Sequence, residues 1–105
     1  MSDKLSGERI RHMAVFRLKH QAGSAEEADF LAALEKLSAI DGVEAFQVVR
    51  EVSPKNGFDY AVTMEFANRD AYEGYNNHPD HVAFVEGRWV PEVDEFMEVD
   101  FAERA

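Results

Sequence analysis

The chain has 105 residues, 46% of them hydrophobic, which is enough for one domain with a single core. It carries 21 acidic against 11 basic residues, a formal net charge of -10, so nucleic acid and anionic membranes are not expected as partners. The absence of cysteine excludes disulfides, thiolate metal ligands and cysteine nucleophiles.

The N-terminal residues 1–8 are polar and are expected to form a flexible arm ahead of a single domain over residues 9–105. This arm lacks the apolar core of a signal peptide, and no stretch of the chain is apolar enough to cross a membrane. Together with the lack of cysteine, these features predict a cytoplasmic protein.

The domain begins with a strand over residues 9–19, where two sets of side chains alternate between opposite faces. A helix follows, for which Ser24 is the expected N-cap and Glu27 completes a capping box. Apolar residues recur at helical spacing over residues 30–40, and an Asp-Gly pair then ends the helix.

Two further strands are predicted at residues 43–52 and 58–66, joined by a turn-rich segment that ends in Asn-Gly. A closing strand is predicted at residues 96–101. The segment just before it stays unassigned, because Pro91 is incompatible with an uninterrupted helix.

The second helical region is predicted in two pieces. Asp70 is the expected cap of a helix that begins at Ala71 and ends near Asn77. Proline has a fixed φ and no N–H, and it pushes the residue before it out of the helical conformation. A new helix is therefore expected to start at Pro79.

The resulting order is β-α-β-β-α-β, which predicts an α+β ferredoxin-like fold with a four-stranded antiparallel sheet and helices on one face. The opposite face of that sheet is not fully polar, because Met13, Val15, Ala61 and Thr63 would lie on it. A second copy of the same sheet is the simplest cover, so a homodimer is expected.

The segment around Pro79 is the richest in chemistry, with Tyr75, His78 and His81 within two turns of one another. His81 falls in the first turn of the helix that starts at Pro79. Unpaired backbone N–H groups there disfavour a positive charge, so His81 should stay neutral and able to accept a proton.

A small-molecule pocket is predicted between the sheet and the helices, because His12 points to the sheet face that Tyr75 and His81 should cover. The side chains expected to bind a ligand there are His12, Phe16, Phe30, Leu34, Val62 and Phe84. A neutral imidazole beside a phenol can remove a proton α to a carbonyl while the phenol stabilises the enolate oxygen. His81 as base and Tyr75 as hydrogen-bond donor would thus support aldol or cyclase chemistry.

A structural role for the same groups is the favoured alternative: His81 would bond a backbone carbonyl or Tyr75 and lock the helix restart, and His12 would pair with a neighbour. His78 is expected to be a cap or a surface residue. A metal site at His78, Asp80 and His81 is less favoured than either the catalytic or the structural role, and no metal or cofactor is expected.

The acidic residues near the C-terminus have a simpler interpretation. Asp94, Glu95 and Glu98 are expected to form a solvated sheet edge that discourages the addition of another strand.

Several segments, taken in order and spacing, resemble one known family. They are His12-Met13-Ala14-Val15-Phe16-Arg17-Leu18-Lys19, Ile40-Asp41-Gly42-Val43, Phe58-Asp59-Tyr60-Ala61-Val62, Tyr75 with His78-Pro79-Asp80-His81, and Val99-Asp100-Phe101. From His12 to Phe101 the chain is similar to the stress-responsive dimeric α/β-barrel (Dabb) proteins. This resemblance implies a homodimer whose two sheets form a barrel.

One plant member of that family is a polyketide cyclase that needs no metal. The resemblance matches His81 and Tyr75 to its catalytic histidine and tyrosine, and His12 to a histidine of its pocket. Tyr60 replaces a further pocket histidine and is expected to contact the ligand. The resemblance implies a stress-response protein, and together with the predicted pocket it leads us to expect binding of a small apolar or carbonyl-containing molecule, with a cyclase- or lyase-like enzyme as the alternative.

Overall fold

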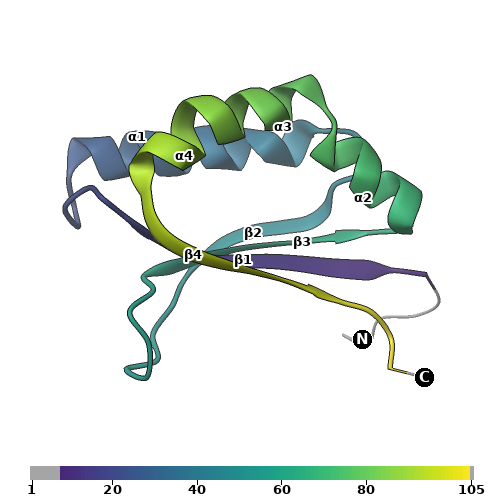
Figure 1. Cartoon of the computed structure of the whole chain (residues 1–105), viewed down its shortest axis with the longest axis horizontal. Helices are drawn as coiled ribbons and strands as arrows, with labels where there is room; N and C mark the ends of the chain where they lie inside the picture. The colour runs from purple at the N-terminus through teal and green to yellow at the C-terminus, as the bar shows by residue number, and fades with distance from the viewer. Residues whose placement is uncertain (1–7, 105) are drawn as a thin grey trace.

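One antiparallel sheet of four strands runs through the computed structural model, which describes residues 8–104 (Figure 1). The strands are β1 (Ile10–Leu18), β2 (Glu44–Arg50), β3 (Tyr60–Phe66) and β4 (Val93–Phe101). They are ordered β2-β3-β1-β4, which confirms the ferredoxin-like topology. Seven of the eight residues predicted to form an N-terminal arm lie outside the described part of the chain.

All the helical segments lie over one face of this sheet (Figure 1). They are α1 (Ala25–Glu35), a 3₁₀ turn η1 (Lys36–Ala39), α2 (Arg69–Asn76), α3 (Pro79–Phe84), a π-helical turn η2 (Val85–Trp89) and α4 (Val90–Glu92). None of the helices within residues 8–104 combines the length and the apolar character needed to span a membrane.

The helix starts follow from short polar side chains. Ser24 caps α1 as predicted, since its hydroxyl accepts a hydrogen bond from the Glu27 N–H. The predicted cap of α2 is wrong: Asn68, with an extended backbone, accepts from the Ala71 N–H at 2.9 Å. Asp70 instead lies inside the first turn, where a carboxylate faces the positive end of the helix dipole.

Pro79 separates α2 from α3, as the sequence predicts. His78 precedes it in an extended conformation and caps α3, because its Nδ1 accepts a hydrogen bond from the Asp80 N–H at 3.0 Å. The segment around Pro91, which the sequence left unassigned, is helical, and Pro91 does not interrupt the helical path. The Val90 N–H donates five residues back to the Val85 carbonyl, so a π-helical turn leads into the last short helical turn, which holds Pro91.

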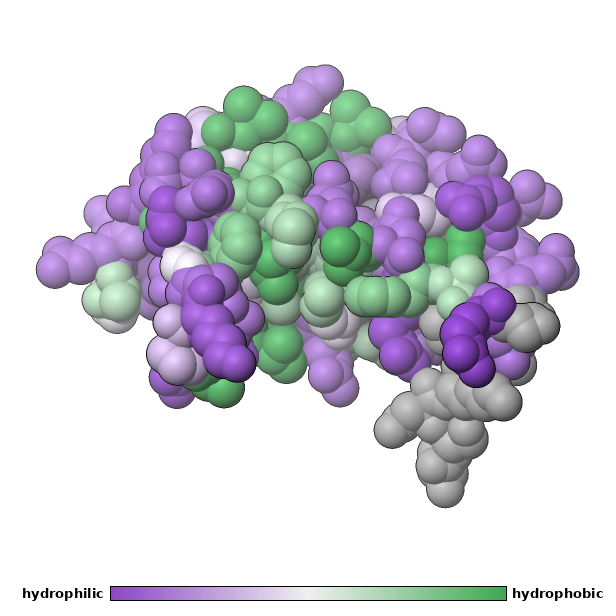
Figure 2. Space-filling view, turned by 60° about the horizontal axis from the view of Figure 1, so that its bottom comes forward, coloured by the Kyte–Doolittle hydropathy of each residue, from purple (hydrophilic) through white to green (hydrophobic). Residues whose placement is uncertain are grey.

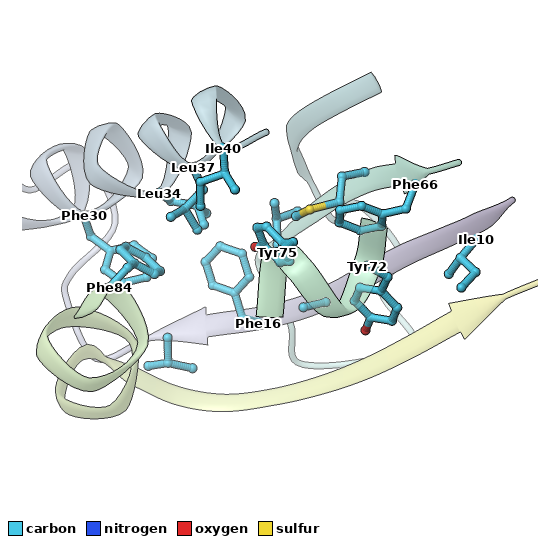
Figure 3. Close-up of a cluster of buried hydrophobic side chains, with 14 of the residues drawn as sticks. Ile10, Phe16, Phe30, Leu34, Leu37, Ile40, Phe66, Tyr72, Tyr75 and Phe84 are labelled. Atoms are coloured by element: carbon cyan, nitrogen blue, oxygen red, sulfur yellow. The ribbon is translucent and has the colours of Figure 1, made fainter. Parts of the chain in front are cut away.

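The core lies between the sheet and the helices. Alternate residues of β1, namely Ile10, His12, Ala14, Phe16 and Leu18, are buried against the helices. Figure 3 shows Phe30, Leu34 and Leu37 of α1 and η1, and Ile40 just after η1, pointing toward the sheet, while Tyr72 and Tyr75 extend from α2. His12 is the one polar residue among the buried side chains of the described region, so its ring nitrogens need partners inside the fold.

The other face of the sheet carries no helix and is partly apolar. Met13 and Val15 point to this face, opposite Val99 and Met97 of β4. Met97 keeps 52% of its surface exposed. Figure 2, turned so that the underside of the sheet comes forward, shows hydrophobic side chains across the middle of the molecule between hydrophilic flanks. The predicted second face is therefore present and uncovered in the single chain.

The cap of α2 can be tested by a pair of substitutions. Asn68→Ala removes the acceptor for the Ala71 N–H and should lower the free energy of unfolding by about 1 kcal/mol. Asp70→Ala removes only an exposed charge near the helix dipole and should cost about 0.3 kcal/mol or less. Urea unfolding of both variants measures the difference, and an equal or larger loss for Asp70→Ala would contradict the assignment.

Candidate functional site

A cavity of about 580 Å³ opens between the sheet and the helical layer. Its lining comes from β1, β3, β4, all four α-helices, the 3₁₀ turn and the π-helical turn. Of the residues that the sequence analysis placed in a pocket, those that line it are His12, Leu34, Val62, Tyr75, His81 and Phe84. Segments far apart in the sequence therefore meet at one hollow.

Three predicted ligand contacts do not line the cavity. Phe16 and Phe30 are fully buried behind it, where both rings contact Trp89, a residue of the cavity wall. Tyr60 stacks on Phe16 with 5.8 Å between the ring centroids. A direct contact of these three residues with a ligand stays a prediction that the shape of this cavity does not support.

His81 is anchored across the Pro79 break. Its Nδ1 lies 3.0 Å from the backbone carbonyl of Asn76, which only accepts, so Nδ1 carries the hydrogen and Nε2 is left as an acceptor. Burial lowers the pKa of His81, nearby His12 lowers it further, and the bond to Asn76 opposes the shift. The imidazole is therefore neutral, as expected, although burial rather than the helix terminus is the main cause.

Tyr75 lies against this imidazole, with 4.3 Å between the two ring centroids. Its side chain is buried, and burial is also the main reason why the pKa of Tyr75 is raised above its ordinary value. The phenol therefore keeps its proton and can donate a hydrogen bond to a ligand. Together the two side chains place one donor and one acceptor on the cavity wall.

A hydrogen-bond network that the sequence analysis missed joins β1, β4 and α2. His12 Nδ1 lies 2.6 Å from Asp100 Oδ1, and the Tyr72 hydroxyl donates to Asp100 Oδ2 at 2.9 Å. Burial and the bond to Asp100 raise the pKa of Tyr72, so its hydroxyl remains a donor. The expected pairing of His12 with a neighbour is thus seen, and this pairing directs Nε2 toward the side where Glu98 lies.

The position of Glu98 differs from the expectation that it forms a solvated sheet edge with Asp94 and Glu95. Asp94 and Glu95 pair with Arg17 at 2.8 and 2.9 Å, at the outer side of the sheet. Glu98, by contrast, lines the cavity, with Oε1 at 3.8 Å from Nε2 of His12. The signal was present in the alternation of the last strand, which puts Phe96, Glu98 and Asp100 on the face of His12.

No metal centre is evident in this region. Within residues 8–104, histidine, aspartate and glutamate side chains nowhere gather in a group of three or more suited to a metal ion. His78 and His81 each make a local bond on opposite sides of Pro79, as an N-cap and as an anchor to Asn76.

Comparison with known proteins finds similarity in both sequence and fold. The family described as Stress Responsive A/B Barrel Domain matches residues 10–103. A stress-response A/B barrel domain-containing protein of Arabidopsis thaliana, At5g22580, is 30% identical over 97 residues, covering 88% of this chain and 84% of that protein.

Solved structures share the fold. A Dabb family protein with a ferredoxin-like fold from Mesorhizobium loti is 50% identical, with a TM-score of 0.93 over 94% of this chain and 100% of that one. A dimeric ferredoxin-like protein of unknown function from Thermobifida fusca is 26% identical, with a TM-score of 0.76 over 96% of both chains. The hydroxynitrile lyase of Passiflora edulis, 16% identical with a TM-score of 0.78 over 90% of this chain and 92% of its own, shares the fold alone.

The protonation of His81 has a measurable consequence for stability. Its pKa is lower in the folded protein than the ordinary value of 6.5, so the unfolded chain binds more protons between these two values. The free energy of unfolding should therefore fall as the pH drops from about 6.5 through the lowered pKa, and His81→Gln should lack this part of the decline. An NMR titration that places the pKa of His81 at or above 6.5 would contradict the prediction.

Proposed function

Because the chain belongs to the stress-responsive A/B barrel domain (Dabb) family, we propose that it acts as a homodimer that binds a small apolar or carbonyl-containing molecule. The observation that carries this proposal is the cavity of about 580 Å³ between the sheet and the helices. Its size is in the range of ligand pockets, and apolar walls with a few convergent polar groups are typical of them.

The cavity offers a defined set of polar contacts to such a molecule. The Tyr75 phenol can donate to a carbonyl oxygen, and Nε2 of His81 can accept from a hydroxyl or an acidic C–H. Leu34, Val62 and Phe84 supply apolar surface for the rest of the ligand. A small carbonyl compound therefore matches both the walls and the polar groups.

The proposed dimer rests on the helix-free face of the sheet. Met13, Val15 and Met97 lie on it, and a monomer would leave this apolar surface in water. Packing two such sheets face to face would bury both with the same residues on each subunit. The similar protein from Thermobifida fusca is described as dimeric, which supports the same assembly here.

A cyclase- or lyase-like enzyme is the second candidate, favoured by the close contact of neutral His81 with the Tyr75 ring. In such a reaction a proton α to the substrate carbonyl would pass to Nε2 of His81. The electron pair left on the carbon would move onto the carbonyl oxygen, which Tyr75 would stabilise by hydrogen bonding. The likeness to the Passiflora edulis hydroxynitrile lyase indicates that this fold is compatible with an enzyme. The cytoplasmic location expected from the sequence stays a prediction.

The assembly can be tested by light scattering at micromolar concentration, where the mass should be twice that of one chain. Val15→Glu places a charge in the middle of the helix-free face and should give a folded monomer. Val52→Glu, at a site that is 79% exposed, should leave the dimer intact. A monomeric wild-type protein would overturn the proposed homodimer.

Binding in the cavity can be tested with 4-phenyl-2-butanone, a small ketone with an apolar body. NMR signals of Trp89, Tyr75 and Val62, which line the cavity, should shift on its addition. Leu34→Trp fills the cavity and should abolish these shifts, whereas Val52→Trp on the surface should not. His81→Gln should keep binding but lose any turnover, and equal shifts in wild type and Leu34→Trp would place the ketone elsewhere.

A further inference from the structure

Residues at one end of the cavity set its charge. The inference drawn from this charge rests on the proposed function, that the cavity binds a small molecule. Glu98 lines the cavity there, and its Oε1 lies 3.8 Å from Nε2 of His12. Asp100, two residues further along β4, is bonded to the other ring nitrogen of His12 at 2.6 Å. Two carboxylates therefore flank a single imidazole.

This end stays negative whichever form His12 takes. Two carboxylates give a charge of -2 with a neutral His12 and -1 with a protonated one. Tyr72 and Tyr75 remain uncharged because their pKa values are raised, and His81 remains uncharged because its pKa is lowered.

No basic side chain offsets this charge inside the cavity. The lining residues, all within the described part of the chain, include neither Lys nor Arg. Arg69 lies over the Tyr72 ring, 6.0 Å from its centroid, but it is exposed and does not line the cavity. A ligand carboxylate at this end would therefore face like charges, whereas a cation would be attracted.

Aromatic rings stand beside the carboxylate. Phe96 lies two residues before Glu98 on the same face of β4, and Trp89 packs edge-on against it with 5.5 Å between the ring centroids. Both rings line the cavity, and the faces of aromatic rings attract ammonium groups. Phe96 and Glu98 remain 48% and 59% exposed, so this end is open to a ligand that enters from solvent.

We propose that the cavity selects apolar molecules that carry an amino group over carboxylates of the same shape, and that Glu98 is the residue that sets this preference. The ammonium group would lie between the Glu98 carboxylate and the rings of Trp89 and Phe96, with the apolar body in the cavity. Since Glu98 is partly exposed, solvent and salt screen its charge, and the preference should weaken as ionic strength rises.

Three probes with the same phenylethyl body test this selection: 4-phenylbutan-2-amine, 4-phenyl-2-butanone and 3-phenylpropanoate. At low ionic strength and pH 7, the dissociation constant of the amine should be about tenfold below that of the carboxylate, with the ketone between them. Glu98→Gln keeps the shape of the side chain but removes its charge. In that variant the affinity for the amine should fall several-fold, the affinity for the carboxylate should rise, and the affinity for the ketone should be unchanged.

Glu35→Gln is the matched control, because it removes one exposed carboxylate near the end of α1 without touching the cavity. It should leave the order and the spread of the three affinities as in wild type. If the ketone binds but the amine is no tighter than the carboxylate, or Glu98→Gln leaves the order intact, charge selection is wrong while binding stands. If none of the three probes binds, the proposed binding function fails and the selection fails with it.

Discussion

The hydrogen bonds of His12 are the interaction on which the rest of the site depends. A polar ring buried in an apolar core is costly unless its nitrogens are satisfied. Asp100 on β4 and Tyr72 on α2 provide the partners, at 2.6 and 3.0 Å from Nδ1. These contacts tie the edge strand β4 and the helix α2 to the central strand β1. They thereby place Glu98 and Tyr75 on the walls of the same cavity.

Structural and chemical roles are compatible at His81. Its Nδ1 closes the turn around Pro79 by bonding to Asn76, and that bond fixes the tautomer in which Nε2 is a free acceptor. Burial keeps the ring neutral. The same contact that anchors the start of α3 therefore prepares an acceptor beside the Tyr75 phenol. The donor–acceptor pair suits both a binding protein and an enzyme, and turnover of a substrate distinguishes the two.

Local signals in the sequence were enough for most of the fold, because alternation, capping residues and prolines act over a few residues. They predict the strand face of His12, the Ser24 cap and the restart at Pro79. Two errors have different causes: in one, two nearby residues are both suitable helix caps, and in the other, the outcome depends on the pairing of strands far apart in the sequence. Asn68 and Asp70 are both good caps, and backbone conformation decides between them. Alternation along β4 groups Glu98 with Phe96 and Asp100, but the pairing of β4 with β1 decides that this group shares the face of His12 and lines the cavity.

The proposed function requires an open, ordered cavity between the sheet and the helices that binds a small molecule. A crystal structure of the protein with 4-phenyl-2-butanone tests it most directly. We expect the ketone inside the cavity with its oxygen near the Tyr75 hydroxyl, and the His12–Asp100–Tyr72 bonds unchanged. A cavity closed by the inward movement of Tyr75 and Phe84, with the ketone absent or bound elsewhere on the surface, would contradict it.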